Sequence, residues 1–194
     1  IYTFRIEQAN KNVTKMCETH YLLTLGGIKL GKIISLVNQK GGVGKTTTTV
    51  NLSAGLACRG KKVLIIDADP QGNATSAVGV DKECELSTYD VLVNEVDIKD
   101  AIQPTNVKKL YVCPSNINLA GAEVQLVSMV SRELRLKEQL DKVKDEFDYI
   151  LIDCPPSLGL ITLNAFTASD SVLIPVQCEY FALEGLGQLM NTIN

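Results

Sequence analysis

Short, almost continuously apolar segments recur along the chain, separated by longer stretches in which apolar residues follow helical spacing. The apolar segments are 33–37, 63–66, 110–113, 149–152 and 172–176. Strands that are buried on both faces of a parallel sheet have this continuous apolar character. The pattern therefore predicts an α/β fold: a doubly wound, mainly parallel sheet with helices on both faces.

Helices are expected between these strands. Residues 46–59 predict a helix that ends at Gly60, and residues 88–94 predict a shorter one. Residues 119–143 predict one long helix, because apolar side chains recur there at mostly helical spacing. We expect the apolar face of this helix to lie in the core; it consists of Val124, Val127, Val130, Leu134, Leu136 and Leu140.

The first 29 residues show little periodicity, and Gly26 and Gly27 separate them from the strand and helix pattern that follows. We expect residues 1–29 to form a loosely ordered N-terminal extension and residues 30–194 to form a single domain. A total length of 194 residues agrees with one compact domain and an appendage.

Composition narrows the choice of function. The formal net charge is −3, which argues against a constitutively basic nucleic-acid-binding protein but allows a local DNA-binding face. The six cysteines are widely spaced, so we expect buried free thiols rather than a zinc site or a disulfide framework. No apolar run reaches the roughly 18 residues that span a bilayer, so we expect a cytoplasmic protein without a membrane partner.

A glycine-rich loop lies between the first predicted strand and the first predicted helix. Its glycines allow backbone N–H groups to approach phosphate oxygens, and the helix N-terminus adds a positive dipole. Lys45 would supply a charge for the β and γ phosphates, and the Thr46 hydroxyl a ligand for Mg²⁺. A tight connection without a ligand is the alternative. The predicted ATP and Mg²⁺ site comprises Lys40, Gly41, Gly42, Val43, Gly44, Lys45, Thr46 and Thr47.

The loop departs from the common G-x-x-x-x-G-K-[ST] form, because Gln39 occupies the first glycine position and Lys40 adds a second lysine. Two lysines in one small anion site repel each other unless the ligand is highly charged. Lys40 therefore either points to solvent or meets a phosphate. Since Lys45 serves its own nucleotide, Lys40 could serve the nucleotide of a facing subunit, as an arginine finger does, which predicts an ATP-bridged dimer.

Two carboxylates follow predicted strands at the end where doubly wound sheets bind ligands. Asp69 is the candidate to orient a water in line with the γ phosphate, because Pro70 and Gly72 make a rigid turn around it. An Asx turn or helix cap is the structural alternative. Asp153 ends the strand 149–152 and is placed to act on Mg²⁺ directly or through water, or else to cap the strand end.

These segments resemble the motifs of the ParA/MinD family of P-loop ATPases with a deviant Walker A motif, most closely the ParA/Soj branch, which segregates chromosomes and plasmids. The resemblance covers about residues 30–194 and rests on four motifs, at 40–47, 67–73, 153–157 and 175–185. It implies a P-loop NTPase fold that hydrolyses ATP with Mg²⁺. It also implies that Asp69 is needed for hydrolysis.

The resemblance further implies an ATP-dependent homodimer in which each Lys40 reaches across to its partner. In the family this dimer binds DNA non-specifically, associates with the nucleoid, and is released when a ParB-type partner triggers hydrolysis. Chains of this branch continue past position 194, so we expect the C-terminal part of the family fold, including its main DNA-binding region, to be missing here.

Three other functions remain open. A truncated nucleotide-binding module would hold ATP but hydrolyse little of it. A MinD-like positioning ATPase shares the first motif, but the segments 67–73 and 175–185 match the ParA/Soj branch. A metabolic relative would use the same loop to phosphorylate a small molecule, and the Asp-Pro-Gln-Gly-Asn sequence at 69–73 argues against it.

Overall fold

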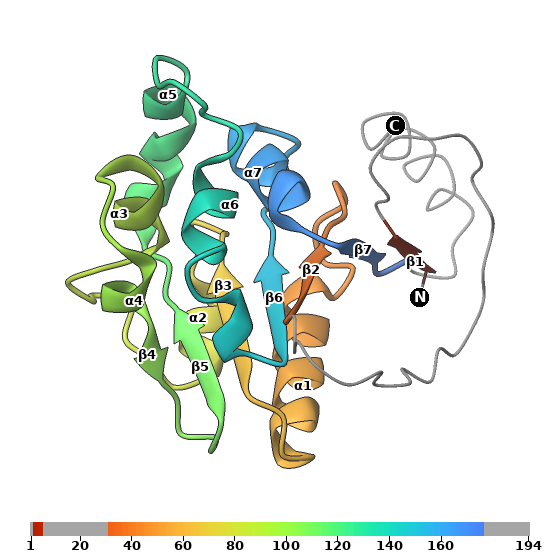
Figure 1. Cartoon of the computed structure of the whole chain (residues 1–194). Coiled ribbons are helices and arrows are strands. Elements are labelled where there is room, and N and C mark those ends of the chain that lie inside the picture. The colour runs from red at the N-terminus through yellow and green to blue at the C-terminus, as the bar shows by residue number, and fades with distance from the viewer. Residues whose placement is uncertain (1, 6–30, 177–194) are drawn as a thin grey trace.

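The computed structural model describes residues 2–5 and 31–176, and these form a seven-stranded sheet of order β1-β7-β2-β6-β3-β5-β4 (Figure 1). The strands are β1 (Tyr2–Arg5), β2 (Lys32–Leu36), β3 (Val63–Asp67), β4 (Gln103–Pro104), β5 (Leu110–Cys113), β6 (Tyr149–Asp153) and β7 (Ser171–Ile174). The five inner strands run parallel, and β1 and β4 pair antiparallel at the two edges. The predicted doubly wound α/β fold is confirmed.

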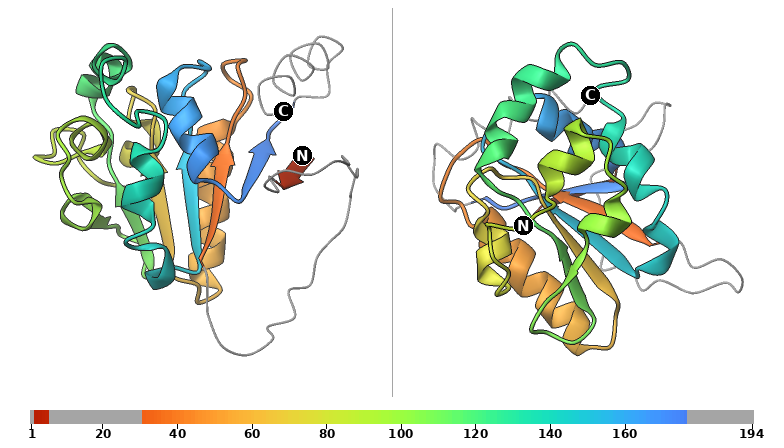
Figure 2. Two further views of the ribbon diagram at one scale, coloured as in Figure 1. Left: turned by 45° about the horizontal axis from the view of Figure 1, so that its top comes forward. Right: turned by 90° about the vertical axis from the view of Figure 1, so that its left-hand side faces the viewer.

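Helices cover both faces of the sheet (Figure 2). One face carries α1 (Lys45–Cys58) and α2 (Asn73–Ala77). The other face carries α3 (Thr88–Val93), α4 (Ile98–Ala101), α5 (Ala122–Leu126), α6 (Arg135–Leu140) and α7 (Leu160–Ala168), with the short 3-10 turns η1 (Ile117–Gly121) and η2 (Lys144–Glu146). Strand β3 shows why its sequence is continuously apolar: Leu64 and Ile66 pack with one core, and Val63 and Ile65 with the other.

The predicted long helix over 119–143 is wrong. The segment instead contains η1, α5, a turn over 127–134 and α6. Four of the side chains expected in the core are exposed: Val124 (78%), Val127 (59%), Val130 (86%) and Leu134 (42%). Only Leu136 and Leu140 of the predicted apolar face are buried.

Contacts from α7 explain why this helix breaks. The Asn164 side-chain amide donates a hydrogen bond to the Arg132 carbonyl (2.6 Å), and its oxygen accepts one from the Leu136 N–H (3.1 Å). Ser131 takes a left-handed conformation (φ 52°), which a continuous α-helix does not allow. Because Asn164 is fully buried, these bonds satisfy its amide and fix the turn in place of helical hydrogen bonds.

Residues 1, 6–30 and 177–194 lie outside the described structure. Tyr2–Arg5, from the expected N-terminal extension, pairs with β7 in the register Tyr2↔Ile174. The boundary at residue 30 stays a prediction, and the 175–185 motif falls largely outside the described residues. Within the described ranges, no helix has the length and apolar character to cross a membrane.

The cysteines are free thiols where the structure describes them, and their burial differs. Cys113 and Cys154 are buried and Cys84 is half-buried. The prediction of burial is wrong for Cys58, the last residue of α1, which is exposed because it lies off the buried face of that helix, formed by Lys45, Thr49, Ser53 and Ala57. Cys17 and Cys178 lie outside the described residues.

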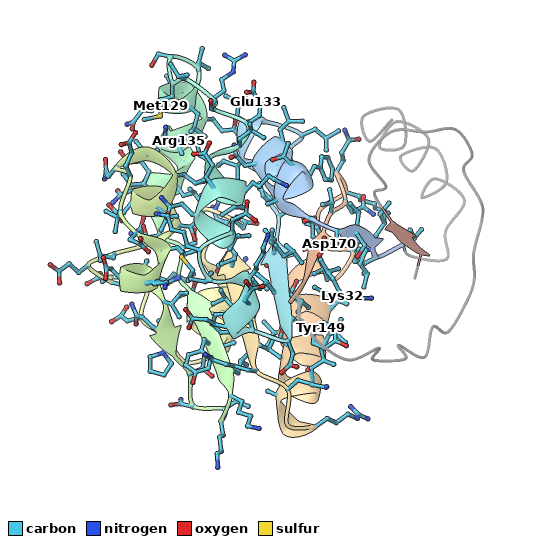
Figure 3. All side chains as sticks on the ribbon, viewed as in Figure 1. Lys32, Met129, Glu133, Arg135, Tyr149 and Asp170 are labelled. Atoms are coloured by element: carbon cyan, nitrogen blue, oxygen red, sulfur yellow. The ribbon has the colours of Figure 1, made fainter. Side chains whose placement is uncertain are left out.

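The parallel strands all end at one edge of the sheet. Figure 3 shows Lys32 and Tyr149, the first residues of β2 and β6, low in the view, whereas Met129 and Glu133 of the 127–134 turn lie at the top. The carboxyl ends of the strands therefore point toward the same end of the molecule as that turn. Doubly wound folds bind their ligands at this edge.

Candidate functional site

The glycine-rich loop connects β2 to α1 at the carboxyl edge. Gly42 (φ 72°) and Gly44 (φ 89°) both take left-handed conformations, and no atom lies within 4 Å of the position that a Cβ would occupy. Conformation rather than crowding thus requires glycine here. A glycine-rich loop of this conformation, followed directly by the start of a helix, is the type of backbone that binds anions.

The two lysines of the loop occupy different environments. Lys45, the first residue of α1, is only 8% exposed, and its ammonium donates a hydrogen bond to the Asn38 carbonyl (3.0 Å). Burial lowers the pKa of Lys45, and the nearby carboxylates of Asp153 and Asp69 oppose that shift. Lys40 is exposed, with its backbone N–H bonded to Asn38 Oδ1 (3.0 Å). The loop therefore holds one cation inside and presents the other at its surface.

Asp153 lies beneath the loop and accepts hydrogen bonds from two α1 hydroxyls. Thr46 Oγ1 donates to Oδ2 (2.7 Å) and Thr49 Oγ1 to Oδ1 (3.1 Å). Strand β6 buries three residues, Ile150 to Ile152, before ending at Asp153, which is itself fully buried and pairs in register with Leu36 of β2. Burial raises the pKa of Asp153 to about 7, and the hydrogen bonds from Thr46 and Thr49 act in the opposite direction.

Thr49 was not among the predicted site residues. Its hydroxyl also lies 3.0 Å from the Lys45 carbonyl, so its one proton is shared between that oxygen and Asp153 Oδ1, and the side chain is fully buried. The sequence could have indicated Thr49 by its position three residues after Thr46, because residues three apart lie on the same face of a helix. A polar residue on that face has to find a partner where the helix packs on the sheet, and Asp153 is that partner.

Asp69 forms the Asx turn that was the structural alternative for it. Its Oδ1 accepts a hydrogen bond from the Gln71 N–H (2.9 Å), and its carbonyl accepts one from the Gly72 N–H (2.9 Å). Its negative charge opposes the lowering of the pKa of Lys45 by burial. The turn thus holds a half-buried carboxylate next to the phosphate loop, so the structural and functional interpretations are compatible.

Asp67, two residues earlier, anchors this loop. Its Oδ2 accepts hydrogen bonds from the Thr75 N–H (2.8 Å) and hydroxyl (2.7 Å), and its Oδ1 accepts one from the Asp69 N–H (3.2 Å). The Thr75 hydroxyl in turn accepts from the Ser115 N–H (2.9 Å). Full burial raises the pKa of Asp67. Its position directly after the apolar run 63–66 was the signal that the sequence offered, and the structure places it in register with Asp153.

The residues present fit a magnesium nucleotide. A threonine hydroxyl and a carboxylate are the hard oxygen donors that Mg²⁺ prefers, and Thr46 and Asp153 supply them side by side. Among residues 2–5 and 31–176, no three His, Cys, Asp or Glu side chains gather to hold a metal. A Mg²⁺ ion at Thr46 and Asp153 would therefore complete its coordination with phosphate oxygens and water, as this ion commonly does.

The structure thus brings together most of the predicted site. Thr46 is hydrogen-bonded to Asp153, and the charges of Asp153 and Asp69 act on Lys45, while Lys40 and Thr47 are exposed. The role of each residue stays a prediction.

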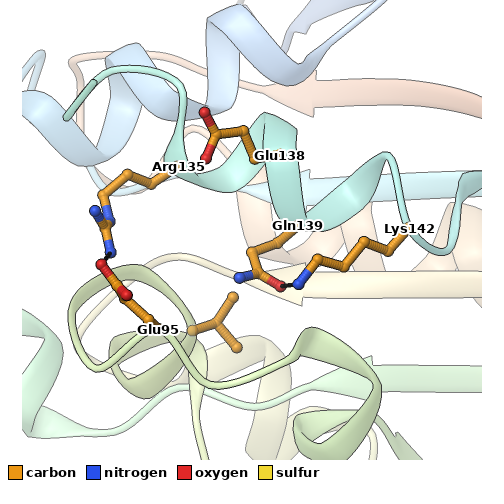
Figure 4. A pocket seen from close by; sticks show the side chains of 6 residues that line it. Glu95, Arg135, Glu138, Gln139 and Lys142 are labelled. Carbon is orange, nitrogen blue, oxygen red and sulfur yellow. Dashed lines mark hydrogen bonds and ion pairs between the residues drawn. The ribbon is translucent and has the colours of Figure 1, made fainter. Parts of the chain in front are cut away.

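A cleft of about 280 Å³ lies between α3 and α6, apart from the glycine-rich loop (Figure 4). Arg135 Nη2 forms an ion pair with Glu95 Oε1 (2.8 Å) across the cleft. The Lys142 ammonium donates hydrogen bonds to Gln139 Oε1 (2.9 Å) and Asp97 Oδ2 (3.1 Å). Arg135 and Lys142 are thus already paired with side chains of the protein, so the lining of this cleft indicates no particular ligand.

Known proteins are similar to this chain in sequence and in fold. The family model described as an AAA domain matches residues 31–194. The chain is 62% identical over 165 residues to the sporulation initiation inhibitor protein Soj of Bacillus subtilis, covering 84% of this chain and 65% of Soj. It is 52% identical over 170 residues to the chromosome partitioning protein ParA of Myxococcus xanthus, covering 87% of this chain and 60% of ParA.

A solved structure of cobyrinic acid a,c-diamide synthase from Mycobacterium smegmatis, with bound ATP analogue and magnesium, matches with a TM-score of 0.81 and 42% identity, covering 84% of this chain and 67% of the synthase. Together the sheet and the loop before α1 define a P-loop nucleotide-binding fold. The chain belongs to the AAA domain family and, within it, to the ParA/Soj branch, which confirms the predicted resemblance. It spans less than two thirds of the length of the two curated relatives.

Proposed function

We propose that the chain binds MgATP at residues 40–47 and hydrolyses it to ADP and phosphate, as the ATPase part of a ParA/Soj-type partition protein. The observation that carries this proposal is the hydrogen bond from Thr46 to the buried Asp153 beneath a loop of left-handed glycines. That pair offers the oxygen ligands for the metal at the position where the open loop offers N–H groups for phosphates.

Each residue has a specific task in this proposal. The loop N–H groups and Lys45 bind the β and γ phosphates, while Thr46 and Asp153 hold Mg²⁺, which neutralises charge on the phosphate oxygens. Asp69, fixed by its own Asx turn, orients a water toward the γ phosphate. Asp67 positions Asp69 through the Asp69 N–H.

The proposed working form is an ATP-dependent homodimer. Lys40 is exposed at the rim of the loop, while Lys45 is buried inside it. This division supports a role for Lys40 toward the nucleotide of the facing subunit, because the loop already has one lysine for its own nucleotide. Such a contact links dimerisation to the presence of ATP.

We further propose that the protein works in the cytoplasm on DNA together with a ParB-type partner, in association with the nucleoid. The support is the 52–62% identity to relatives named for chromosome partitioning and for inhibition of sporulation initiation. The formal net charge of −3 requires that DNA be met by a local basic face of the dimer rather than by the whole surface. We keep the boundary between an N-terminal extension and the ATPase domain at residue 30.

A metabolic function is the second candidate, because the synthase with bound ATP analogue shares the fold at 42% identity. The higher identity to Soj, 62%, favours partitioning. ATP consumption that rises with DNA and a ParB-type protein would support the partition function. Consumption that rises only with a small-molecule substrate would support the metabolic one.

The test of the proposed function is the mass in solution, by light scattering, of the parent chain and of Asp69→Ala, each with and without MgATP. Asp69→Ala is expected to convert from monomer to dimer on MgATP and to remain dimeric, because it binds the nucleotide without hydrolysing it. Lys40→Ala is the matched control and is expected to bind ATP but stay monomeric. A monomeric Asp69→Ala that binds ATP would reduce the function to nucleotide binding.

A further inference from the structure

Glu123, on α5, holds the first turn of α7. Its carboxylate accepts hydrogen bonds from the N–H groups of Leu160 (2.7 Å) and Ile161 (3.3 Å). Gly159, the N-cap residue of α7, has no side chain that could accept them. The first N–H groups of a helix have no partner within the helix, so a residue 37 positions earlier in the chain satisfies them here.

Gly159 makes this contact possible. A Cβ at this position would lie 2.3 Å from Glu123 Oε1 and 2.5 Å from Oε2, distances that real Cβ atoms do not show. The backbone at Gly159 (φ −84°) is open to any residue, so glycine is needed for the close approach of the carboxylate and not for the conformation.

The contact lies at one end of the segment that leads from the nucleotide site. Residues 154–159 connect Asp153 to α7, and the Thr46 and Thr49 hydroxyls hold the Asp153 end. Pro155 and Pro156 have no N–H to donate, which leaves this segment few backbone donors of its own. Glu123 therefore fixes the far end of a short, stiff segment whose near end is the proposed magnesium ligand.

We propose that Glu123 is a positioning residue for ATP hydrolysis, holding residues 154–159 in the arrangement that the reaction requires. This inference rests on the proposed function. Among the described residues, the side-chain hydrogen bonds of Glu123 go to Leu160 and Ile161 and not to the phosphate loop or Lys45, so we expect ATP affinity to change little without it. Catalysis depends on Glu123, because small displacements of positioned groups lower the rate of the chemical step steeply.

The test measures steady-state ATP hydrolysis and amide hydrogen exchange in the parent, Glu123→Ala and Glu123→Gln. In Glu123→Ala, we expect the Leu160 and Ile161 amides to exchange roughly 10-fold faster and kcat to fall roughly 10-fold, with KM for ATP within about twofold of the parent. In Glu123→Gln, we expect partial recovery of both kcat and protection, because the amide oxygen still accepts a hydrogen bond.

The matched control is Thr167→Val, which removes the hydrogen bond from the other end of α7 to the Glu133 carbonyl and is expected to leave kcat unchanged. Faster exchange at residues 160 and 161 with an unchanged kcat would overturn the proposal and leave Glu123 as a helix cap. An equal loss of kcat in Thr167→Val would also overturn it, by showing that α7 is sensitive everywhere.

The same measurements separate this inference from the proposed function. A parent chain without MgATP turnover would overturn the proposed function and, with it, the role of Glu123 in hydrolysis. If the parent hydrolyses ATP but both Glu123 variants have the same kcat as the parent, only the role of Glu123 is overturned. If Glu123→Ala does not fold, Glu123→Gln decides: an unchanged kcat together with faster exchange of either amide contradicts the proposal.

Discussion

The phosphate loop and the junction of α5 with α7 both depend on glycine, for opposite reasons. Gly42 and Gly44 have left-handed backbones and open space around the missing side chain. Gly159 has an ordinary backbone and no space, because the Glu123 carboxylate occupies the position of a side chain. The first region is therefore shaped for a ligand from outside, whereas the second is already filled by the protein's own anion.

The two regions use the same physical principle for an anion at a helix N-terminus. At α7 the anion is Glu123, and it receives two backbone hydrogen bonds. At α1 the Gly44 cap offers no side-chain acceptor, and Lys45 adds a buried cation. A helix start with a cation and no acceptor favours a ligand of high negative charge, which is why the comparison supports a nucleotide phosphate at α1.

The largest expected effect comes from removing the cation of the open region. Lys45→Ala should weaken nucleotide binding roughly 100-fold, about 2.8 kcal/mol, because a charge-assisted contact to phosphate is lost. Titration with a fluorescent ATP analogue measures this. Lys40→Ala, with its side chain at the rim, should bind within about twofold of the parent. Equal binding by Lys45→Ala and the parent would refute the assignment of the loop.

The next effect comes from forcing a side chain into the filled region. Gly159→Ala should lower the free energy of unfolding by about 1–3 kcal/mol, because the new methyl group must displace the Glu123 carboxylate. Gly41→Ala is the matched control: no atom lies within 4 Å of its Cβ position, so its unfolding free energy should change by less than about 0.5 kcal/mol. Denaturant titrations of both variants measure the difference.

A double variant sharpens this prediction. If the Glu123 carboxylate is what a side chain at 159 meets, Gly159→Ala should cost less in the Glu123→Ala background than in the parent. Variants of residues in contact show such interaction energies, about 0.5–3 kcal/mol. Strict additivity of the two changes would show that another group, and not Glu123, limits the space at Gly159.

The two regions also differ in how far the sequence predicts them. The sequence indicates the phosphate-loop region because local residue types determine it. Glycines followed by a helix point to the loop with Lys45 and Thr46, and an acidic residue after a buried strand points to Asp153. The break in the 119–143 segment could not be predicted, because it depends on a residue distant in the sequence. The buried Asn164 of α7 forms hydrogen bonds with the Arg132 carbonyl and the Leu136 N–H, and these bonds interrupt the helix although the apolar residues keep helical spacing. Glu123 was missed for the same reason, since its partners lie 37 and 38 positions away.

The smallest expected effect is on the reactivity of cysteine thiols. It tests whether the segment after Asp153 is closely packed, as the contrast between the two regions requires. Cys154 is fully buried there, and burial raises its pKa well above the usual thiol value. Burial also raises the pKa of Cys113 to about 12. At pH 8 both thiols are therefore protonated and shielded, since the thiolate is the reactive form.

Alkylation followed by peptide mass spectrometry should modify the exposed Cys58 at least roughly 100-fold faster than Cys113 or Cys154, without a change in stability. Raising the pH from 7 to 9 should leave Cys113 unmodified, because its pKa of about 12 stays above that range. If Glu123 packs the segment, Glu123→Ala should speed alkylation of Cys154 while Cys113, on β5, serves as the internal control. Rapid alkylation of Cys154 in the parent would mean that the segment after Asp153 opens readily. The contrast between a closely packed α5–α7 junction and an open phosphate loop would then be wrong.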